Sequence, residues 1–143
     1  MRPLVFALIV AACAVGAPAR ADEPPPISAS LQCDRAVEPG RVRCTVEARV
    51  AQGRTLQWAD VVIVELPELA QALKGRVGPA DSIARDATSE RWAFGLVARK
   101  LGEGEAKVHV RAVVCAAGAP APEERRPRCA TATAIATAIV RVG

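Results

Sequence analysis

Four cysteines follow the first 21 residues of this chain, and they form two close pairs, one near each end of the remaining sequence. The first pair is Cys33 and Cys44, and the second is Cys115 and Cys129. Four cysteines allow three disulfide pairings. The choice among them constrains the fold, because a disulfide requires its two Cα atoms to lie within about 7 Å.

The first pair has the spacing of a hairpin staple. Residues 27–34 and 41–51 both alternate between apolar and polar side chains, and the turn formers Pro39 and Gly40 lie between them. In a hairpin about that turn, Cys33 and Cys44 stand directly opposite each other, within reach of a disulfide. The second pair brackets the segment between the last two predicted strands in the same way. The sequence therefore favours local pairing, Cys33–Cys44 and Cys115–Cys129.

Three alternatives fit the cysteines less well. If Cys44 paired with Cys115 across two sheets, Cys33 would have to pair with Cys129. A structural zinc site uses close Cys-x₂₋₄-Cys knuckles, and redox chemistry uses Cys-x-x-Cys. Gaps of ten and thirteen residues match neither pattern, so no metal or cofactor is predicted.

Residues 1–21 have the pattern of an export signal. Arg2 precedes an apolar run, Leu4–Val15, and Ala19-Arg20-Ala21 is a small-x-small cleavage site. The run is shorter than the roughly 20 residues that a transmembrane helix needs, so no membrane span is expected. We expect an exported protein, periplasmic or extracellular, of a Gram-negative bacterium. Residues 22–26 form a proline-rich linker, and residues 27–143 form one domain.

A second processing site competes with the first. Val10-Ala11-Ala12-Cys13 resembles a bacterial lipobox, in which Cys13 would become a lipidated N-terminus and anchor the protein. The apolar run before it is only seven residues long, at the lower limit for a signal peptide.

Composition argues against two classes of ligand. Cleavage after residue 21 removes two arginines and no acid, which lowers the formal net charge from +4 to +2. Such a small charge, scattered along the chain, gives no reason to expect nucleic acid. After residue 21, only Trp58, Trp92 and Phe94 could supply the aromatic platforms on which sugars and single-stranded bases usually stack.

The dominant period after residue 26 is two, which is typical of half-buried antiparallel strands. The predicted strands are Ile27–Asp34, Arg41–Ala51, Thr55–Leu66, a short edge strand over Ser82–Asp86, Arg91–Lys100, Glu105–Ala116 and Ala130–Val142. Pro67 can open a helix and Gly75 can close one, so a short helix is expected over residues 67–74.

This strand pattern resembles the immunoglobulin-like sandwich domains of exported bacterial proteins. Cys44, Trp58 and Cys115 also occur on the second, third and penultimate strands, the order found in immunoglobulin domains. The resemblance implies an all-β, antiparallel immunoglobulin-like β-sandwich of about seven strands, with one short helix after the third. The local cysteine pairs and the helix depart from that family, and fold resemblance does not transfer function.

His109 is the only histidine, and it is the first residue to consider for catalysis. It alternates with inward Val108 and Val110, so it is expected on the outer face of a strand. A small secreted hydrolase would need an acid such as Glu65 or Glu68 beside it. No nucleophile elbow or histidine cluster accompanies it, and no catalytic residue is predicted.

The segment between the second cysteine pair is the predicted recognition loop. Its charged residues are Glu123, Glu124, Arg125, Arg126 and Arg128. A disulfide at its base would lower the entropy cost of binding. The simpler interpretation is a solvated hairpin loop that the disulfide protects.

The function predicted from the sequence is a non-enzymatic module that binds an unknown protein partner or belongs to the cell envelope, for instance as an inhibitor. The alternatives are the small hydrolase, the lipid-anchored lipoprotein and an assembly subunit. The last would use the uncharged strand 130–142, which could add to another sheet.

Overall fold

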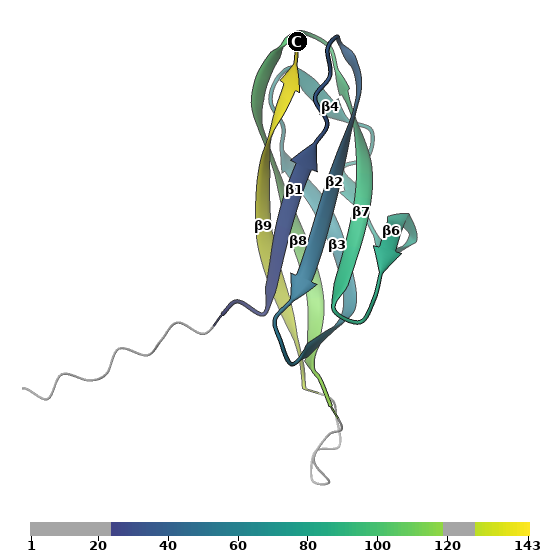
Figure 1. The fold of residues 1–143 in the computed structure, drawn as a ribbon, viewed down its shortest axis with the longest axis vertical. Coiled ribbons are helices and arrows are strands. Elements are labelled where there is room, and N and C mark those ends of the chain that lie inside the picture. Colours follow the sequence, from purple (N-terminus) through teal and green to yellow (C-terminus); the bar gives the residue numbers. More distant parts are fainter. Residues whose placement is uncertain (1–23, 119–127) are drawn as a thin grey trace, which may run out of the picture.

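The computed structural model describes residues 24–118 and 128–143, and these residues form two antiparallel β-sheets packed face to face (Figure 1). Sheet A has the order β1-β2-β7-β4, with β6 also pairing with β7, and consists of β1 (Ile27–Cys33), β2 (Gly40–Val50), β4 (Ala70–Ala72), β6 (Ser82–Arg85) and β7 (Ser89–Ala98). Sheet B has the order β5-β3-β8-β9 and consists of β3 (Arg54–Glu65), β5 (Arg76–Val77), β8 (Gly102–Ala116) and β9 (Cys129–Val142).

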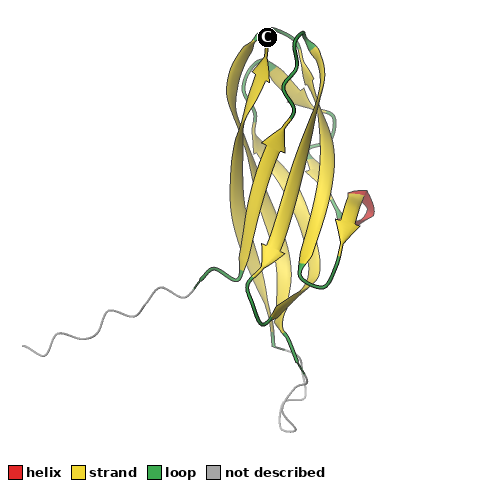
Figure 2. Ribbon diagram, viewed as in Figure 1, coloured by secondary structure: helices red, strands yellow, loops and turns green. Residues whose placement is uncertain are grey.

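All seven predicted strands are present, and the structure adds two short ones, β4 and β5. The prediction of a helix over residues 67–74 is wrong, because this segment contains β4. The one helical element in the described parts of the chain is a short 3-10 turn, η1 (Pro79–Asp81), coloured red in Figure 2.

Tertiary pairing explains why residues 67–74 are not helical. Leu69 and Ala70 are buried, and β4 completes the upper edge of sheet A against β7. The amide of Leu73 donates to the Gly95 carbonyl at 3.0 Å, and the Arg99 amide donates to the Leu69 carbonyl at 2.8 Å. A two-turn helix is marginal in isolation, so the free edge of β7 determines the conformation of this segment.

Both open sides of the sandwich are bridged. On one side the chain runs from β4 in sheet A to β5 in sheet B and back to β6 in sheet A. On the other side β1 lies beside β9 (Figure 1). There the chain after β1 crosses to sheet B, where the Ala36 amide donates to the Arg141 carbonyl and the Gly143 amide donates to the Ala36 carbonyl.

The core follows the period-two pattern. Trp92 is fully buried on β7, with Phe94 and Leu96 on the same inner face. The Trp92 indole donates to the Gly78 carbonyl at 3.2 Å, which satisfies the buried N–H. Trp58, the tryptophan of the third predicted strand, is only half-buried and lies beside a register shift in β3. The core tryptophan of this sandwich is therefore Trp92.

Both predicted disulfides are confirmed, Cys33–Cys44 and Cys115–Cys129. Each joins directly opposed residues of neighbouring strands within one sheet. A cross-link that closes a loop of this size stabilises a fold by about 3 kcal/mol in the chain-entropy model. The bridges fix the register of two hairpins and do not join the sheets.

The last strand pairs along its whole length with β8. Its alanines face inward and its threonines and isoleucines face outward, with Ile135 and Ile139 exposed. Because β1 lies beside its outer edge, β9 does not end the sandwich as a bare edge strand. No helix in the described ranges is long and apolar enough to cross a membrane.

Candidate binding site

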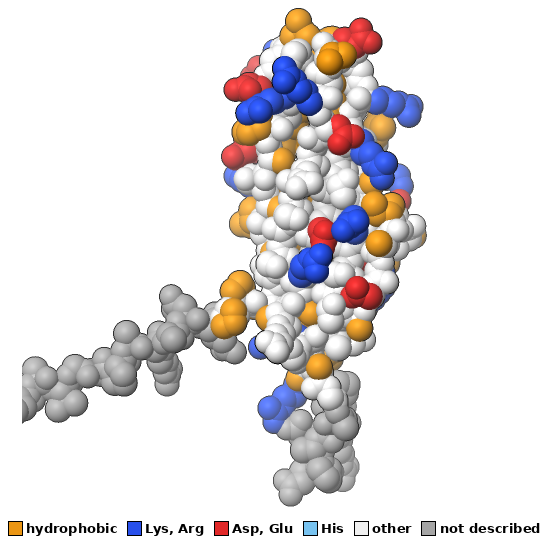
Figure 3. All heavy atoms as spheres, viewed as in Figure 1, with side chains coloured by type: hydrophobic (Ala, Val, Ile, Leu, Met, Phe, Trp, Pro, Cys, Tyr) orange, Lys and Arg blue, Asp and Glu red, His pale blue; other side chains and the backbone are white. Residues whose placement is uncertain are grey.

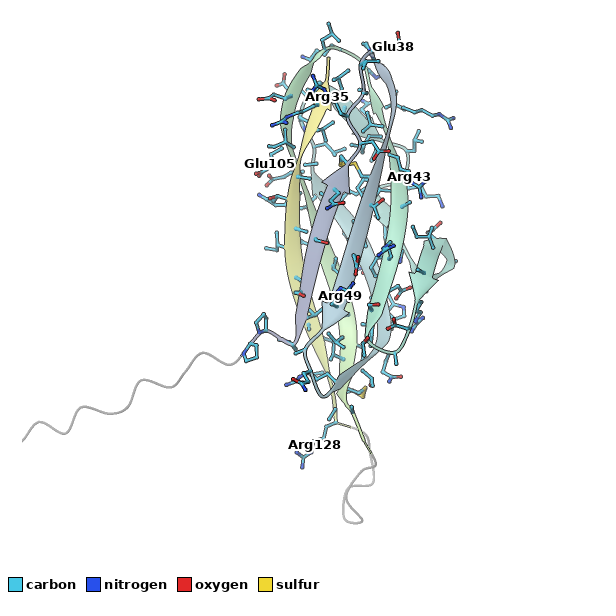
Figure 4. The ribbon with its side chains drawn as sticks, viewed as in Figure 1. Arg35, Glu38, Arg43, Arg49, Glu105 and Arg128 are labelled. Carbon is cyan, nitrogen blue, oxygen red and sulfur yellow. A yellow bond between two sulfur atoms is a disulfide. The ribbon has the colours of Figure 1, made fainter. Side chains whose placement is uncertain are left out.

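A hollow of about 580 Å³ lies on the outer face of sheet A, in its upper half as drawn in Figure 4. Arg41 and Arg43 of β2 line it together with Leu73, which follows β4. Its floor includes Ala93 and Gly95 of β7. Binding sites for small molecules commonly have volumes of 300–1,000 Å³, so this hollow has the capacity to hold a side chain or a short segment of a partner.

The strand period places the two arginines. Val42 and Cys44 of β2 are 2% and 0% exposed on the inner face, so the residues that alternate with them must point outward. Arg41 and Arg43 are both exposed. In the register of β2 and β7, Arg41 pairs with Val97 and Arg43 pairs with Gly95. Arg43 therefore stands beside a glycine on the neighbouring strand, and Arg41 stands beside a valine.

Leu73 forms the opposite wall, with its side chain over Gly95. A Cβ atom at position 95 would come within 2.8 Å of the Leu73 Cδ1 atom, so the leucine side chain occupies the space that glycine leaves. Leu73 is nevertheless 55% exposed. The hollow is thus cationic along β2 and apolar along the opposite wall.

Arg41 and Arg43 have no ion-pair partner among the residues that the structure describes. Within residues 24–118 and 128–143, neither side chain makes a hydrogen bond or a salt bridge. Asp34 also lines the hollow, beside Arg43 in the β1–β2 register. Arg35 donates from Nε and Nη2 to the Gly143 carbonyl, at 3.2 and 2.7 Å. Two arginines are therefore available to a ligand.

The lower half of the same face differs. Glu47 of β2 forms salt bridges with both Arg49 and Arg91, at 2.9 Å for the Arg91 Nη2 atom. The hydrogen bond from Arg91, followed by the charges of the two arginines, lowers the pKa of Glu47 despite partial desolvation. Figure 3 looks onto this face and shows acidic side chains among the basic ones. Arg49 and Arg91 thus share one carboxylate within the sheet.

On the outer face of sheet B, a buried acid is fully paired. Asp60 of β3 is 0% exposed and accepts hydrogen bonds from Arg111 at 2.9 and 2.5 Å and from Arg76 at 2.5 Å. Hydrogen bonding to Arg111, followed by that to Arg76, lowers the pKa of Asp60 against the opposing effect of burial. This cluster connects β3, β5 and β8, and we assign it a structural role.

His109 is half-buried on the same outer face, opposite Val62 of β3 and Ile135 of β9. Glu65 is held by Lys107 at 2.9 Å, and Glu68 is almost fully exposed, with the Lys100 Nζ atom 3.9 Å away. In the described parts of the chain, neither acid bonds to His109. The acid and base groups of the alternative hydrolase are therefore not assembled.

One acid lies inside the sandwich. Glu90 of β7 is 1% exposed, and neither of its carboxylate oxygens has a hydrogen-bond partner among the described residues. Arg85 of β6 approaches it at 3.9 Å, and the nearby Ser82 hydroxyl makes its hydrogen bonds to main-chain carbonyls. Burial raises the pKa of Glu90, and the charge of Arg85 only partly opposes that effect.

Most of the predicted recognition loop lies outside the described residues. Glu123, Glu124, Arg125 and Arg126 lie outside the described residues, as does Cys13. Arg128 is described and exposed, and its carbonyl accepts from the Ala116 amide at 2.9 Å beside the second disulfide. No group of histidine, cysteine or acidic side chains within the described ranges could hold a metal ion.

Comparison with known proteins adds little. No family model matches the chain, and no curated protein matches it. Among solved structures, the chain is similar to BslA, a bacterial hydrophobin, with a TM-score of 0.38 and 10% identity, over 82% of this chain and 95% of that one. The case for a function therefore rests on the residues of the hollow.

Proposed function

We propose that this protein is an exported, non-enzymatic module of immunoglobulin-like architecture that binds a protein partner through the hollow lined by Arg41, Arg43 and Leu73. The observation that carries the proposal is the pair of exposed arginines without ion-pair partners in the described chain, facing an exposed leucine across a floor of small residues. Arginine is enriched among the residues that contribute most to binding at protein interfaces.

The strand order supports the immunoglobulin-like assignment. Strands β1-β2-β7-β6 follow the order A-B-E-D of an immunoglobulin constant domain, and β3-β8-β9 follow the order C-F-G. The short strands β4 and β5 are additions between the third and fourth strands of that scheme. The disulfides depart from it, because each stays within one sheet.

Two features support export. Residues 1–21 have the charged, apolar and small-residue regions of a signal peptide. The two disulfides are of a kind that forms and persists in oxidising compartments. The periplasm or the extracellular space is therefore the compartment in which we would seek a partner.

Site-specific photo-crosslinking in the native organism tests the proposal. The photoreactive residue p-benzoylphenylalanine would replace Leu73 in the hollow or, as the control, Ile83 on β6. The two side chains are 55% and 50% exposed, so they are matched in accessibility. We expect a discrete adduct with one protein from position 73 and none from position 83.

Charge variants show whether the adduct depends on the arginines. In the protein that carries the photoreactive residue at position 73, we expect the double substitution Arg41→Gln and Arg43→Gln to abolish the adduct. The double substitution Arg49→Gln and Arg91→Gln removes the same charge from the lower half of the face and should preserve it. An adduct that survives loss of Arg41 and Arg43, or identical adducts from positions 73 and 83, would refute the site.

A further inference from the structure

We infer that the hollow recognises an extended acidic segment whose carboxylates occur on alternate residues, as in Glu-x-Glu. This inference rests on the proposed function and specifies the chemistry of the partner. It follows from the spacing of Arg41 and Arg43, the apolar wall across from them and the acid beside Arg43.

The spacing selects the register. Arg41 and Arg43 are alternate residues of one strand, so their side chains leave the same face about 7 Å apart. An extended peptide repeats its side chains at the same interval. A segment lying along β2 can therefore place carboxylates i and i+2 against the two guanidinium groups together. Carboxylates at i and i+3 would point to opposite faces of the peptide.

The guanidinium group suits carboxylate ligands. Its planar fork donates two parallel hydrogen bonds to one carboxylate, a stronger and more directional contact than a single ammonium provides. Neither Arg41 nor Arg43 would have to give up an ion pair within the described chain to make that contact.

The surface of β7 beside the arginines offers an apolar contact to a peptide. The Leu73 side chain lies over Gly95, and Ala93 has only a methyl group. A peptide can therefore lie against Leu73 with its acidic side chains reaching toward β2. Leu73 then offers an apolar contact to a side chain of the segment, which favours an apolar residue near the acidic pair.

An acid lies near the Arg43 end of the arginine pair. The Asp34 amide donates to the Arg43 carbonyl, which places Asp34 beside Arg43, whereas Glu47, farther along β2, is paired with Arg49 and Arg91. Asp34 would repel a longer run of negative charge or a flat anionic surface. Two arginines beside an acid therefore favour a short acidic motif over an anionic membrane, which requires a broader basic surface.

Two isomeric peptides test the inference by fluorescence polarisation, using the chain purified with both disulfides intact. One peptide reads Thr-Glu-Val-Glu-Thr-Leu and the other Thr-Glu-Thr-Val-Glu-Leu, so composition and charge are identical and only the acid spacing differs. We expect the first to bind about tenfold more tightly at low salt. Equal affinity for the two isomers would overturn the inference.

Substitutions tie the preference to the hollow. We expect Arg43→Gln to abolish the preference for the Thr-Glu-Val-Glu-Thr-Leu peptide and Arg49→Gln to preserve that preference. We expect Arg43→Lys, which retains the charge but not the planar guanidinium group, to reduce the preference. Circular dichroism confirms that each variant is folded. Binding of phosphatidylglycerol vesicles with no preference between the peptides would also overturn the inference.

The two proposals can fail separately. Equal peptide affinities combined with an arginine-dependent crosslink at Leu73 would refute the acidic spacing and leave the binding site standing. Loss of the arginine dependence in the crosslinking experiment would refute the site itself.

Discussion

The side chain of Leu73 lies over Gly95, at the point where the chain leaves the upper edge of sheet A. The Leu73 amide donates to the Gly95 carbonyl at 3.0 Å, and a Cβ atom on residue 95 would come within 2.8 Å of the leucine Cδ1 atom. Glycine at this position thus sets the depth of the hollow and the position of its apolar wall.

Gly95→Ala should weaken partner binding without unfolding the protein. The added methyl group meets the flexible end of Leu73, which can move aside, so the free energy of unfolding should change by less than about 1 kcal/mol. The displaced leucine should reduce the affinity for the acidic peptide. Polarisation and thermal unfolding measure the two effects. A stability loss of several kcal/mol would contradict this description of the contact.

Asp60→Asn should destabilise the fold by about 1–3 kcal/mol, because it leaves Arg76 and Arg111 without their shared carboxylate. The loss of a fully buried ion pair would destabilise the fold further, but Arg76 and Arg111 are about half exposed, so solvent screens their charges. Urea unfolding measures the loss. Glu103→Gln, which removes an exposed pair with Arg141, should cost less than about 0.5 kcal/mol and serves as the control.

The same carboxylate gives a defined pH dependence. Because Arg111 and Arg76 lower the pKa of Asp60 in the folded state, its contribution to stability is present above its ordinary value of 3.8. That contribution is lost as the pH falls through the lowered folded pKa. In Asp60→Asn this acid-induced loss should be absent. An unchanged pH profile of stability in the variant would show that the cluster is not linked to folding in this way.

Glu90→Gln should stabilise the protein at neutral pH by about 1 kcal/mol, since it removes a buried charge that has no hydrogen-bond partner among the described residues. Burial raises the folded pKa of Glu90 above its ordinary value of 4.5. Its favourable contribution is therefore full below pH 4.5 and is lost as the pH rises. The variant and the parent should converge in urea unfolding at acidic pH. A less stable variant at neutral pH would mean that Arg85 compensates the buried charge.

The strands could be predicted from the sequence wherever an element is long enough to show its period. Residues 41–51 alternate without interruption, and β2 lies there. The strands β4 and β5, with three and two residues, are too short to show a period and form only because neighbouring edges accept them. The helix prediction over residues 67–74 failed for that reason, because local end signals carried less weight than pairing with β7.

The hollow could not be predicted, because it depends on register. Arg43 and Gly95 are far apart in the chain, and nothing local places them opposite each other. The disulfides were predictable because each lies within one hairpin, where the position of the turn determines which residues face each other. The same limit applies to Trp92, whose place in the core depends on which strands meet across the sandwich.

The two disulfides should differ in accessibility to reductant. Cys129, the first residue of β9, is exposed, although its partner Cys115 is buried. In the other bridge Cys33 is half-buried and Cys44 is 0% exposed on the inner face of sheet A. Thiol exchange requires access to a sulfur atom, so mild dithiothreitol should open Cys115–Cys129 first. Cys33–Cys44 should resist until the protein unfolds.

Alkylation followed by peptide mass spectrometry over time distinguishes the two bridges. The partially reduced protein should keep its fold and lose about 3 kcal/mol of stability, the contribution of one loop of this size. Cys115→Ala with Cys129→Ala should reproduce that loss without reductant, and the double substitution at Cys33 and Cys44 should lose a similar amount. Simultaneous reduction of both bridges would mean that reduction follows global unfolding, and that exposure at Cys129 does not control it.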